Sequence, residues 1–267
     1  MKVFVIDVGK CSGCYSCQLV CKDEHCGNDW TPYARPQPET GHFWGKLNEY
    51  VRGKIPQVKI SYVFMPCQHC ANAPCIKACP LEDTLYRRDD GLVIIDPKKC
   101  DGCKKCVSAC PYGAIYFNNE INIAQKCTGC AHLLDRGWKE PRCVDVCAHG
   151  AIRFGEEEEL KDLIAQAEIL NPEFGTKPRV YYLNLPKKFI AGTVYDPAAE
   201  EVVIGAVCTL TGEGGALTTR TDEFGDFRFD GLKTGIFTLK IESGGRTLTI
   251  ESINTEKDVS LGDIALT

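Results

Sequence analysis

The alternation of apolar and polar positions divides the chain into three regions. Over residues 1–155, short apolar stretches lead into cysteine-rich runs, a pattern that predicts short strands followed by loops. Over residues 156–186, apolar positions recur at helical spacing up to Asn171-Pro172 and an extended stretch follows, which predicts a linker. Over residues 187–267, short alternating stretches separated by Gly, Asp and Asn predict a small β-sandwich.

Within the first region, residues 5–21 and 94–110 repeat one another without a gap. Both follow the pattern I-D-x-x-K-C-x-G-C-x-x-C-x-x-x-C, and the KCTGC at Lys126–Cys130 repeats its core. An internal repeat of this kind indicates two pseudo-symmetric halves of one fold. The sequence therefore predicts an α+β protein with two pseudo-symmetric ferredoxin-like halves, loop insertions and a C-terminal β-sandwich.

Cysteine usage indicates what these runs do. The chain has 18 cysteines among 267 residues, a count found in the disulfide frameworks of secreted proteins or in metal sites. Disulfide frameworks tend to be short chains with irregular spacings, whereas these cysteines fall in tight repeated runs. Metal ligation is therefore favoured, and because thiolate ligands must stay reduced, assembly is expected in a reducing compartment.

Charge and the remaining motifs exclude several functions. The N-terminal MKVFVIDVGKCSGC does not resemble a secretory signal, and no apolar stretch reaches the length of a membrane span. We expect a cytoplasmic protein without direct membrane insertion, although export together with a partner stays open. A net charge of −5 disfavours a nucleic-acid partner. Because the sequence lacks a Ser/His/Asp set, a phosphate loop and a dinucleotide fingerprint, we expect no catalytic residues on this chain.

Residues Cys100–Pro111 form the ferredoxin run C-x2-C-x2-C-x3-C-P. In two-cluster ferredoxins the first three thiolates of such a run hold one iron–sulfur cluster, and the fourth ligates the neighbouring cluster. Each run therefore needs a partner, and further groups begin at Cys11, Cys67 and Cys127. Four groups of four cysteines fit four 4Fe–4S clusters.

Exchange of the fourth cysteines between paired groups gives four ligand sets, which we call quartets A to D. The second group pairs with the third, and the first with the fourth. Lys22 and Ala148, rather than proline, follow the fourth cysteines of the first and fourth groups. The expected quartets are A (Cys11, Cys14, Cys17, Cys147), B (Cys21, Cys127, Cys130, Cys143), C (Cys67, Cys70, Cys75, Cys110) and D (Cys79, Cys100, Cys103, Cys106).

Other metal centres are alternatives to these quartets. Taken alone, the fourth group from Cys127 to Cys147 could form a zinc ribbon, because two separated cysteine pairs suit tetrahedral zinc. The other runs do not suit zinc, since their fourth thiolate points elsewhere. A 3Fe–4S centre is possible but not indicated, because no expected cysteine is missing.

Two cysteines and two histidines stand outside the quartets. Cys208 is expected to be a small buried residue on a sandwich strand, and Cys26 to be structural or at the surface. His69 and His132 lie beside ligand loops, where they either tune a cluster by hydrogen bonding or simply pack; packing is favoured.

Residues 27–66 form an insert rich in aromatics and prolines, which predicts an irregular arm. Such a segment either docks a large partner, since aromatic residues are favoured in interface cores, or covers the first cluster.

The four groups, with their long gap between Cys130 and Cys143, resemble the four-cluster subunits of molybdopterin oxidoreductases of the dimethyl-sulfoxide-reductase type. The resemblance covers roughly residues 1–155. It implies electron transfer through four 4Fe–4S clusters and a large catalytic subunit that holds Mo or W on two pyranopterins. It also implies that the cluster of the first run lies nearest that subunit and that of the third run is distal.

A narrower resemblance covers nearly the whole chain. NDW, GHFW, PCQHCANAPC, AQKCTGCAHLLD and GTKPRVYY are similar to segments in the small subunits of pyrogallol–phloroglucinol transhydroxylases and related aromatic hydroxylases and dehydroxylases. TDEFGDFRFDGL followed by GIFTLKI resembles transthyretin-like domains, which implies a transthyretin-like sandwich. Transhydroxylase subunits lack the cysteines of the third run, whereas Cys100, Cys103 and Cys106 are present here. The difference implies net redox chemistry with an external electron carrier.

We therefore expect a non-catalytic electron-transfer subunit whose partner acts on hydroxylated aromatic rings. The rivals are a free polyferredoxin carrier and a subunit of a different Mo/W oxidoreductase or hydrogenase-type complex. The aromatic insert and the sandwich argue against a free carrier, because a shuttle needs neither.

Overall fold

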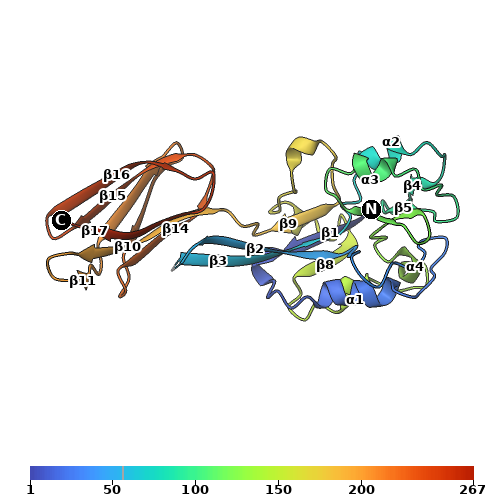
Figure 1. Ribbon diagram of the computed structural model, residues 1–267, viewed down its shortest axis with the longest axis horizontal. Coiled ribbons are helices and arrows are strands. Elements are labelled where there is room, and N and C mark those ends of the chain that lie inside the picture. The colour runs from blue at the N-terminus through green and yellow to red at the C-terminus, as the bar shows by residue number, and fades with distance from the viewer. Residues whose placement is uncertain (56) are drawn as a thin grey trace. The chain divides into compact units, whose positions relative to one another are not determined.

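The computed structural model describes residues 1–55 and 57–267, which form two compact units (Figure 1). The first unit contains Met1–Glu49 and Ser61–Leu185. The second contains Tyr50–Ile60 and Pro186–Thr267. The segment expected as a linker thus lies within the first unit, and part of the aromatic insert lies within the second.

The first unit is built on the N-terminal strand β1 (Lys2–Asp7), whose residues 3–6 are buried. It is the middle strand of three, with β8 (Ile152–Glu156) antiparallel on one side and β9 (Val180–Leu183) parallel on the other. A continuous apolar run suits this position, because a central strand is covered on both faces. The sheet joins the start of the chain to segments about 150 and 180 residues later.

Short elements carry the cysteine runs away from this sheet. The strands pair as small antiparallel hairpins, and the helices follow individual cysteine loops. Helix α1 contacts α5, and α2 contacts α3, so the helices pair as the four cysteine groups do. The hairpins are β4 (Leu85–Arg87) with β5 (Val93–Ile95) and β6 (Ile115–Asn118) with β7 (Ile123–Lys126); the helices are η1 (Val8–Lys10), α1 (Ser16–His25), α2 (Pro74–Ala78), α3 (Lys105–Ala109), α4 (Ala131–Leu134) and α5 (Arg142–Asp145).

Two segments of the first unit differ from the sequence-based prediction. The helix expected from residue 156 onward is only α6 (Lys161–Ile164), because Glu156 instead belongs to β8 and pairs with the N-terminal amino group and Lys2. A single turn, η2 (Pro172–Phe174), precedes β9. At the N-terminal end of this segment, strand pairing therefore determines the backbone structure, although the sequence has helical periodicity.

The irregular arm expected over residues 27–66 is wrong for its second half. There the chain forms a hairpin of β2 (Lys46–Lys54) and β3 (Gln57–Met65). Residues 58–62 alternate β-branched or aromatic with polar side chains, and Val63 and Phe64 follow, a pattern that favours a strand. The prolines and aromatics of the first half masked this signal.

The second unit is a sandwich of two four-stranded sheets, as the alternating tail predicts. Their facing apolar residues form one core, which contains the fully buried Cys208. One sheet contains β10 (Lys188–Asp196), β11 (Glu201–Val202), β14 (Asp226–Leu232) and β17 (Val259–Ala265); the other contains β12 (Val207–Gly212), β13 (Gly215–Arg220), β15 (Ile236–Ser243) and β16 (Arg246–Asn254).

The tip of the β2–β3 hairpin packs within this second unit. Arg52 Nη1 donates to Asp258 Oδ1 at 3.1 Å, and the guanidinium lies over the Phe189 ring. Asp258 Oδ1 also accepts from the backbone N–H of Phe189 at 3.1 Å. The Asp258 carboxylate is nearly buried, so it links the hairpin tip to the sandwich.

We predict that Asp258→Ala destabilises the sandwich by about 1–3 kcal/mol, because it leaves the Phe189 backbone N–H without its acceptor and removes the counter-charge of Arg52, which keeps only the Lys187 carbonyl. Asp230→Ala, which removes the exposed partner of Lys59, should cost less than about 1 kcal/mol. Urea unfolding of the full chain, followed by far-UV circular dichroism, measures both. Equal effects would show that the Asp258 link does not stabilise the sandwich.

Candidate metal centres

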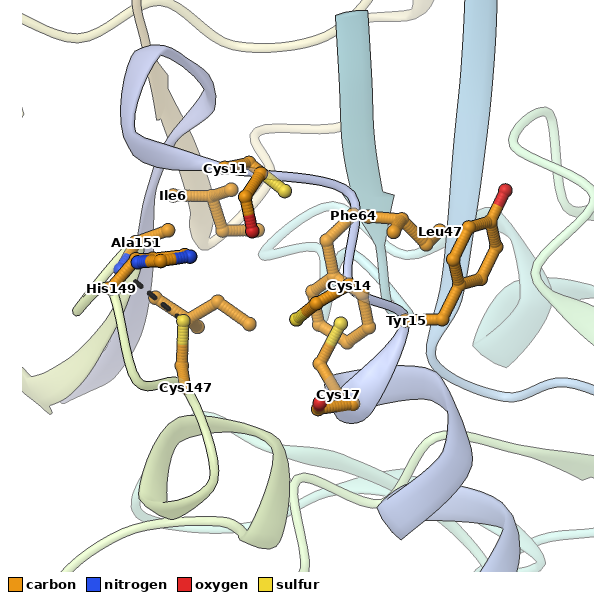
Figure 2. A pocket seen from close by; sticks show the side chains of 13 residues that line it. Ile6, Cys11, Cys14, Tyr15, Cys17, Leu47, Phe64, Cys147, His149 and Ala151 are labelled. Atoms are coloured by element: carbon orange, nitrogen blue, oxygen red, sulfur yellow. Dashed lines mark hydrogen bonds between the residues drawn. The ribbon is translucent and has the colours of Figure 1, made fainter.

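Quartet A surrounds a pocket between the first cysteine loop and the end of α5. Figure 2 shows the sulfur atoms of Cys11, Cys14, Cys17 and Cys147 directed toward one shared space. Cys147 Sγ accepts from the backbone N–H of Ala151 at 3.3 Å, which fixes the thiol that comes from the distant fourth group. The apolar part of the wall comes from Ile6, Leu47, Phe64 and Ile152.

Quartet B lies deeper. Cys21 on α1, Cys143 on α5, and Cys127 and Cys130 on the loop between β7 and α4 are all buried. Burial raises the pKa of Cys21 well above its usual range, and neighbouring charges on Cys127 and Cys130 raise it further. The pKa of Cys143 is raised by burial and then by the other three members, which shows that the four thiols are neighbours.

Quartet C combines the second group with the fourth cysteine of the third. Burial raises the pKa of Cys70 to about 12, and charge on Cys67, Cys75 and Cys110 also contributes. Cys67, Cys70 and Cys75 are buried, and Cys110 is half-buried.

Quartet D lines another pocket. It combines the third group with the fourth cysteine of the second, the reverse of quartet C. Cys100, Cys103 and Cys106 meet Cys79, the fourth cysteine of the second group. Burial raises the pKa of Cys106 to about 12, with smaller contributions from charge on its three partners and on Cys75.

The zinc alternative does not fit this arrangement. Cys147 lies with the first group, whereas Cys127, Cys130 and Cys143 lie with Cys21. The fourth group therefore does not converge on one point. Within residues 1–55 and 57–267, moreover, no set of three His, Cys, Asp or Glu side chains is close enough to hold a single metal ion.

The quartets follow one another as A, B, C and D. Charge on Cys17 of quartet A acts on Cys21 of B, and charge on Cys67 of C acts on Cys127 of B. Charge on Cys75 of C acts on Cys106 of D. The packing agrees, because neighbouring quartets share apolar clusters, with A and B in one, B and C in a second, and C and D in a third. The two end quartets carry the exposed cysteines Cys14 and Cys103.

The pockets suit a cationic inorganic core. All 18 cysteines are free thiols, and burial raises the pKa of most quartet thiols, so the protein alone favours their protonated form. Iron supplies the positive charge that stabilises the thiolates, and its binding releases their protons. All quartet cysteines except Cys14 and Cys103 are half-buried or buried, so the pockets offer sulfur ligands that a cationic core would stabilise as thiolates.

The repeated backbone geometry explains how each loop curves around its pocket. Gly13 and Gly102 occupy the same place in their runs, with φ of +73° and +78°. Tyr15 and Lys104, two residues later, both have φ of +62° and precede α1 and α3. The second group departs from this pattern, because His69 replaces the glycine and adopts φ of +43°.

That substitution concerns His69, for which the sequence left two roles open, tuning of a cluster and packing, with packing favoured. His69 is buried, accepts from the Val93 backbone N–H through Nδ1 at 2.9 Å, and places Nε2 3.9 Å from Cys127 Sγ. His132 instead packs, as expected: it stacks on Trp30 and its Nε2 lies 3.0 Å from Glu24 Oε1. The sequence signal that singles out His69 is its position, since it stands where the first and third groups have glycine.

Comparison with known proteins agrees with both units. A 4Fe–4S dicluster domain matches residues 58–157, and a carboxypeptidase regulatory-like domain matches residues 190–267. The small subunit of pyrogallol hydroxytransferase from Pelobacter acidigallici is 39% identical over 98% of each chain. The chain belongs to the iron–sulfur subunits of the molybdopterin oxidoreductases.

Other members of this family match about two thirds of the chain. A tetrathionate reductase subunit from Salmonella typhimurium is 36% identical over 70% of this chain and 73% of its own. A sulfite dehydrogenase subunit from Allochromatium vinosum is 33% identical over 67% and 81%. A solved 5-hydroxyisourate hydrolase from Klebsiella pneumoniae covers 30% of this chain and 91% of its own at 20% identity, but its TM-score of 0.26 supports no conclusion.

This iron–sulfur subunit is therefore an electron-transfer component of a larger oxidoreductase. In the part of the chain that the structure describes, no helix is both long and apolar enough to cross a membrane.

We predict that Gly102→Ala loosens quartet D. A Cβ there would lie 2.5 Å from Asn122 Nδ2 and from the Asn122 carbonyl oxygen, in addition to about 1–2 kcal/mol of strain at positive φ. Gly113→Ala is the matched control, because its φ is also positive but no atom lies within 4 Å of the added Cβ. Iron and acid-labile sulfide per chain should fall only in the Gly102 variant. An equal loss in both would attribute the effect to strain alone.

Proposed function

We propose that the chain is a wire of four 4Fe–4S clusters held by quartets A to D. It carries electrons between a catalytic subunit with Mo or W on two pyranopterins and an external redox partner. A cluster with four thiolate ligands has no open iron position, so its chemistry is the gain and loss of one electron.

The exposure pattern carries this proposal. Quartets A and D, at the two ends of the series, hold the exposed Cys14 and Cys103, whereas every member of quartet B is buried. Electrons can therefore enter and leave at the ends without exposing the middle to solvent. We assign the quartet A end to the catalytic subunit and the quartet D end to the external partner, as the family resemblance implies.

The same proposal includes the two ferredoxin-like halves. One half would unite quartets A and B through the α1 and α5 contact, and the other would unite C and D through the α2 and α3 contact. The equal backbone angles at Tyr15 and Lys104 support an internal repeat. Cluster insertion into free thiols would take place in a reducing compartment, for which we propose the cytoplasm.

For the partner we propose chemistry on hydroxylated aromatic rings. Support comes from the name of the relative that matches almost the whole chain, a pyrogallol hydroxytransferase small subunit. The full set of Cys79, Cys100, Cys103 and Cys106 around one pocket indicates a complete outlet for electrons. Net reductive dehydroxylation or oxidative hydroxylation therefore fits better than transfer of a hydroxyl group without electron flow. We assign no substrate-transforming site to this chain.

A second candidate is a different Mo/W oxidoreductase. Over about two thirds of its length, the chain is 36% identical to a tetrathionate reductase subunit and 33% identical to a sulfite dehydrogenase subunit, and neither name involves an aromatic ring.

The deciding measurement is metal and protein analysis of the natively purified complex. We expect a large subunit, Mo or W near one atom per small subunit, and about sixteen iron atoms per chain, four for each cluster. Iron without Mo or W and without a large partner would instead identify a free polyferredoxin. Turnover assays with phenolic and sulfur-oxyanion substrates then separate the two candidate partners.

We also predict that Cys100→Ala abolishes turnover with the external carrier, because it removes a ligand at the outlet end. Cys26→Ala is the control, since Cys26 belongs to no quartet and lies in an isolated bridge with Gln37. Turnover falls to background in the first variant and stays near the wild-type rate in the second. Unchanged turnover in a Cys100→Ala complex with reduced iron content would refute the wire.

A further inference from the structure

Among the described residues, Lys126 is the only Asp, Glu, Lys or Arg whose backbone and side chain together are buried, with 2% of the residue exposed. It ends β7 and directly precedes Cys127 of quartet B. Burying an ammonium is costly unless an opposite charge compensates it. The surroundings of Lys126 therefore need a source of negative charge.

The protein itself offers only dipoles. Lys126 Nζ donates to the carbonyl oxygens of Val93 and Cys127, the second at 3.0 Å. In the described part of the chain it forms no ion pair with a carboxylate. Backbone carbonyls solvate the ammonium, but they leave its net charge in place.

The charged groups that can compensate it are the thiolates of the two middle quartets. Burial raises the pKa of Cys127 in quartet B and of Cys75 in quartet C to about 11. The Lys126 charge opposes that rise at both thiols and also at Cys110 of quartet C. The geometry agrees, because Nζ bonds the Cys127 carbonyl of quartet B and the carbonyl of Val93, a residue that packs in one apolar cluster with Cys70 and Cys75 of quartet C. One ammonium therefore lies at the junction between quartets B and C.

A single residue of β5, Val93, holds this junction in place. The Val93 carbonyl accepts from Lys126, while the Val93 N–H donates to Nδ1 of His69. Because Nδ1 accepts, the neutral imidazole carries its proton on Nε2, which faces Cys127 Sγ. The Lys126 ammonium and the His69 Nε2–H, both held by Val93, thus lie next to Cys127 of quartet B.

We propose that Lys126 is the shared counter-charge of the clusters in quartets B and C and that it raises the reduction potential of both. The inference rests on the proposed ligation of these quartets. A 4Fe–4S cluster with its thiolates carries about two negative charges when oxidised and about three when reduced. A fixed cation therefore stabilises the reduced form more, and burial strengthens the effect because water does not screen it. Lys126 acts as a positioning residue for charge along the wire.

The chain contains its own control for this idea. Lys10 and Lys99 also directly precede the first cysteine of their groups, but both side chains are exposed. Solvent and salt screen an exposed charge, so Lys99 should have little effect on quartet D. Lys99→Met and Lys126→Gln thus remove the same charge from the same place in the motif, once in water and once in the interior.

The experiment is a potentiometric titration of the purified holo-complex, followed by electron paramagnetic resonance. In Lys126→Gln, which keeps a donor for the Val93 carbonyl, two midpoint potentials should fall and two should stay. At the wild-type midpoint of an affected cluster, the ratio of oxidised to reduced form should rise at least tenfold, which is about 59 mV for one electron. Lys126→Arg and Lys99→Met should titrate like the wild type.

Iron analysis separates this inference from the proposed function. Full iron content with four unchanged midpoint potentials in Lys126→Gln overturns the counter-charge role and leaves the wire intact. The same conclusion follows if Lys99→Met shifts the midpoint potentials as much as Lys126→Gln does. Loss of iron in Lys126→Gln but not in Lys126→Arg supports a requirement for the charge. Loss in both variants overturns it, since the shape of lysine would then be what matters. Wild-type complex without iron in this chain refutes the ligation itself.

Discussion

The structure depends on bringing together thiols that are far apart in the sequence. No cysteine group closes a pocket by itself, because its fourth member lies in the quartet of another group. Quartet A needs Cys147 next to Cys11, and quartet D needs Cys79 next to Cys100. The β1 sheet and the helix pairs hold these distant loops at fixed separations. The surrounding fold therefore has the task of keeping four sets of soft, protonatable ligands in position.

Burial of these thiols has a cost that the fold distributes unevenly. Quartets B and C lie in the interior, where desolvation opposes thiolate formation. Lys126 and His69 are buried in the same region. Quartets A and D have partly exposed members and include Cys14, whose pKa is lowered by the Ser16 side-chain hydroxyl. The interior sites thus depend on charge supplied by the protein, whereas the end sites can also use water.

Much of the cluster unit could be read from the sequence because its signals are local. Run spacing and the ferredoxin rule predict the quartets, and the structure brings each set of four together; cluster binding there stays a proposal. Glycine at positive φ, shared by Gly13 and Gly102, also follows from the repeat. The buried state of Lys126 could not be predicted, since Lys10 and Lys99 occupy the same motif position at the surface. Burial there depends on packing against β5, which is a tertiary property. The shortened α6 was missed for a similar reason, because Glu156 pairs with β1 at the start of the chain. The hairpin of β2 and β3 was missed for a local reason, because the prolines and aromatics before it masked its strand signal.

The two units are also interleaved along the chain, which constrains the order of events during synthesis. Strand β1 leaves the ribosome first, but its neighbours β8 and β9 follow about 150 and 180 residues later. Residues 50–60 must likewise wait for Pro186–Thr267 before their own unit can form. Neither unit can therefore finish folding as a nascent N-terminal fragment. Quartets A and B in particular cannot come together before Cys143 and Cys147 are synthesised, so a chain truncated before them would present the thiols of the first run with no pocket to enclose them.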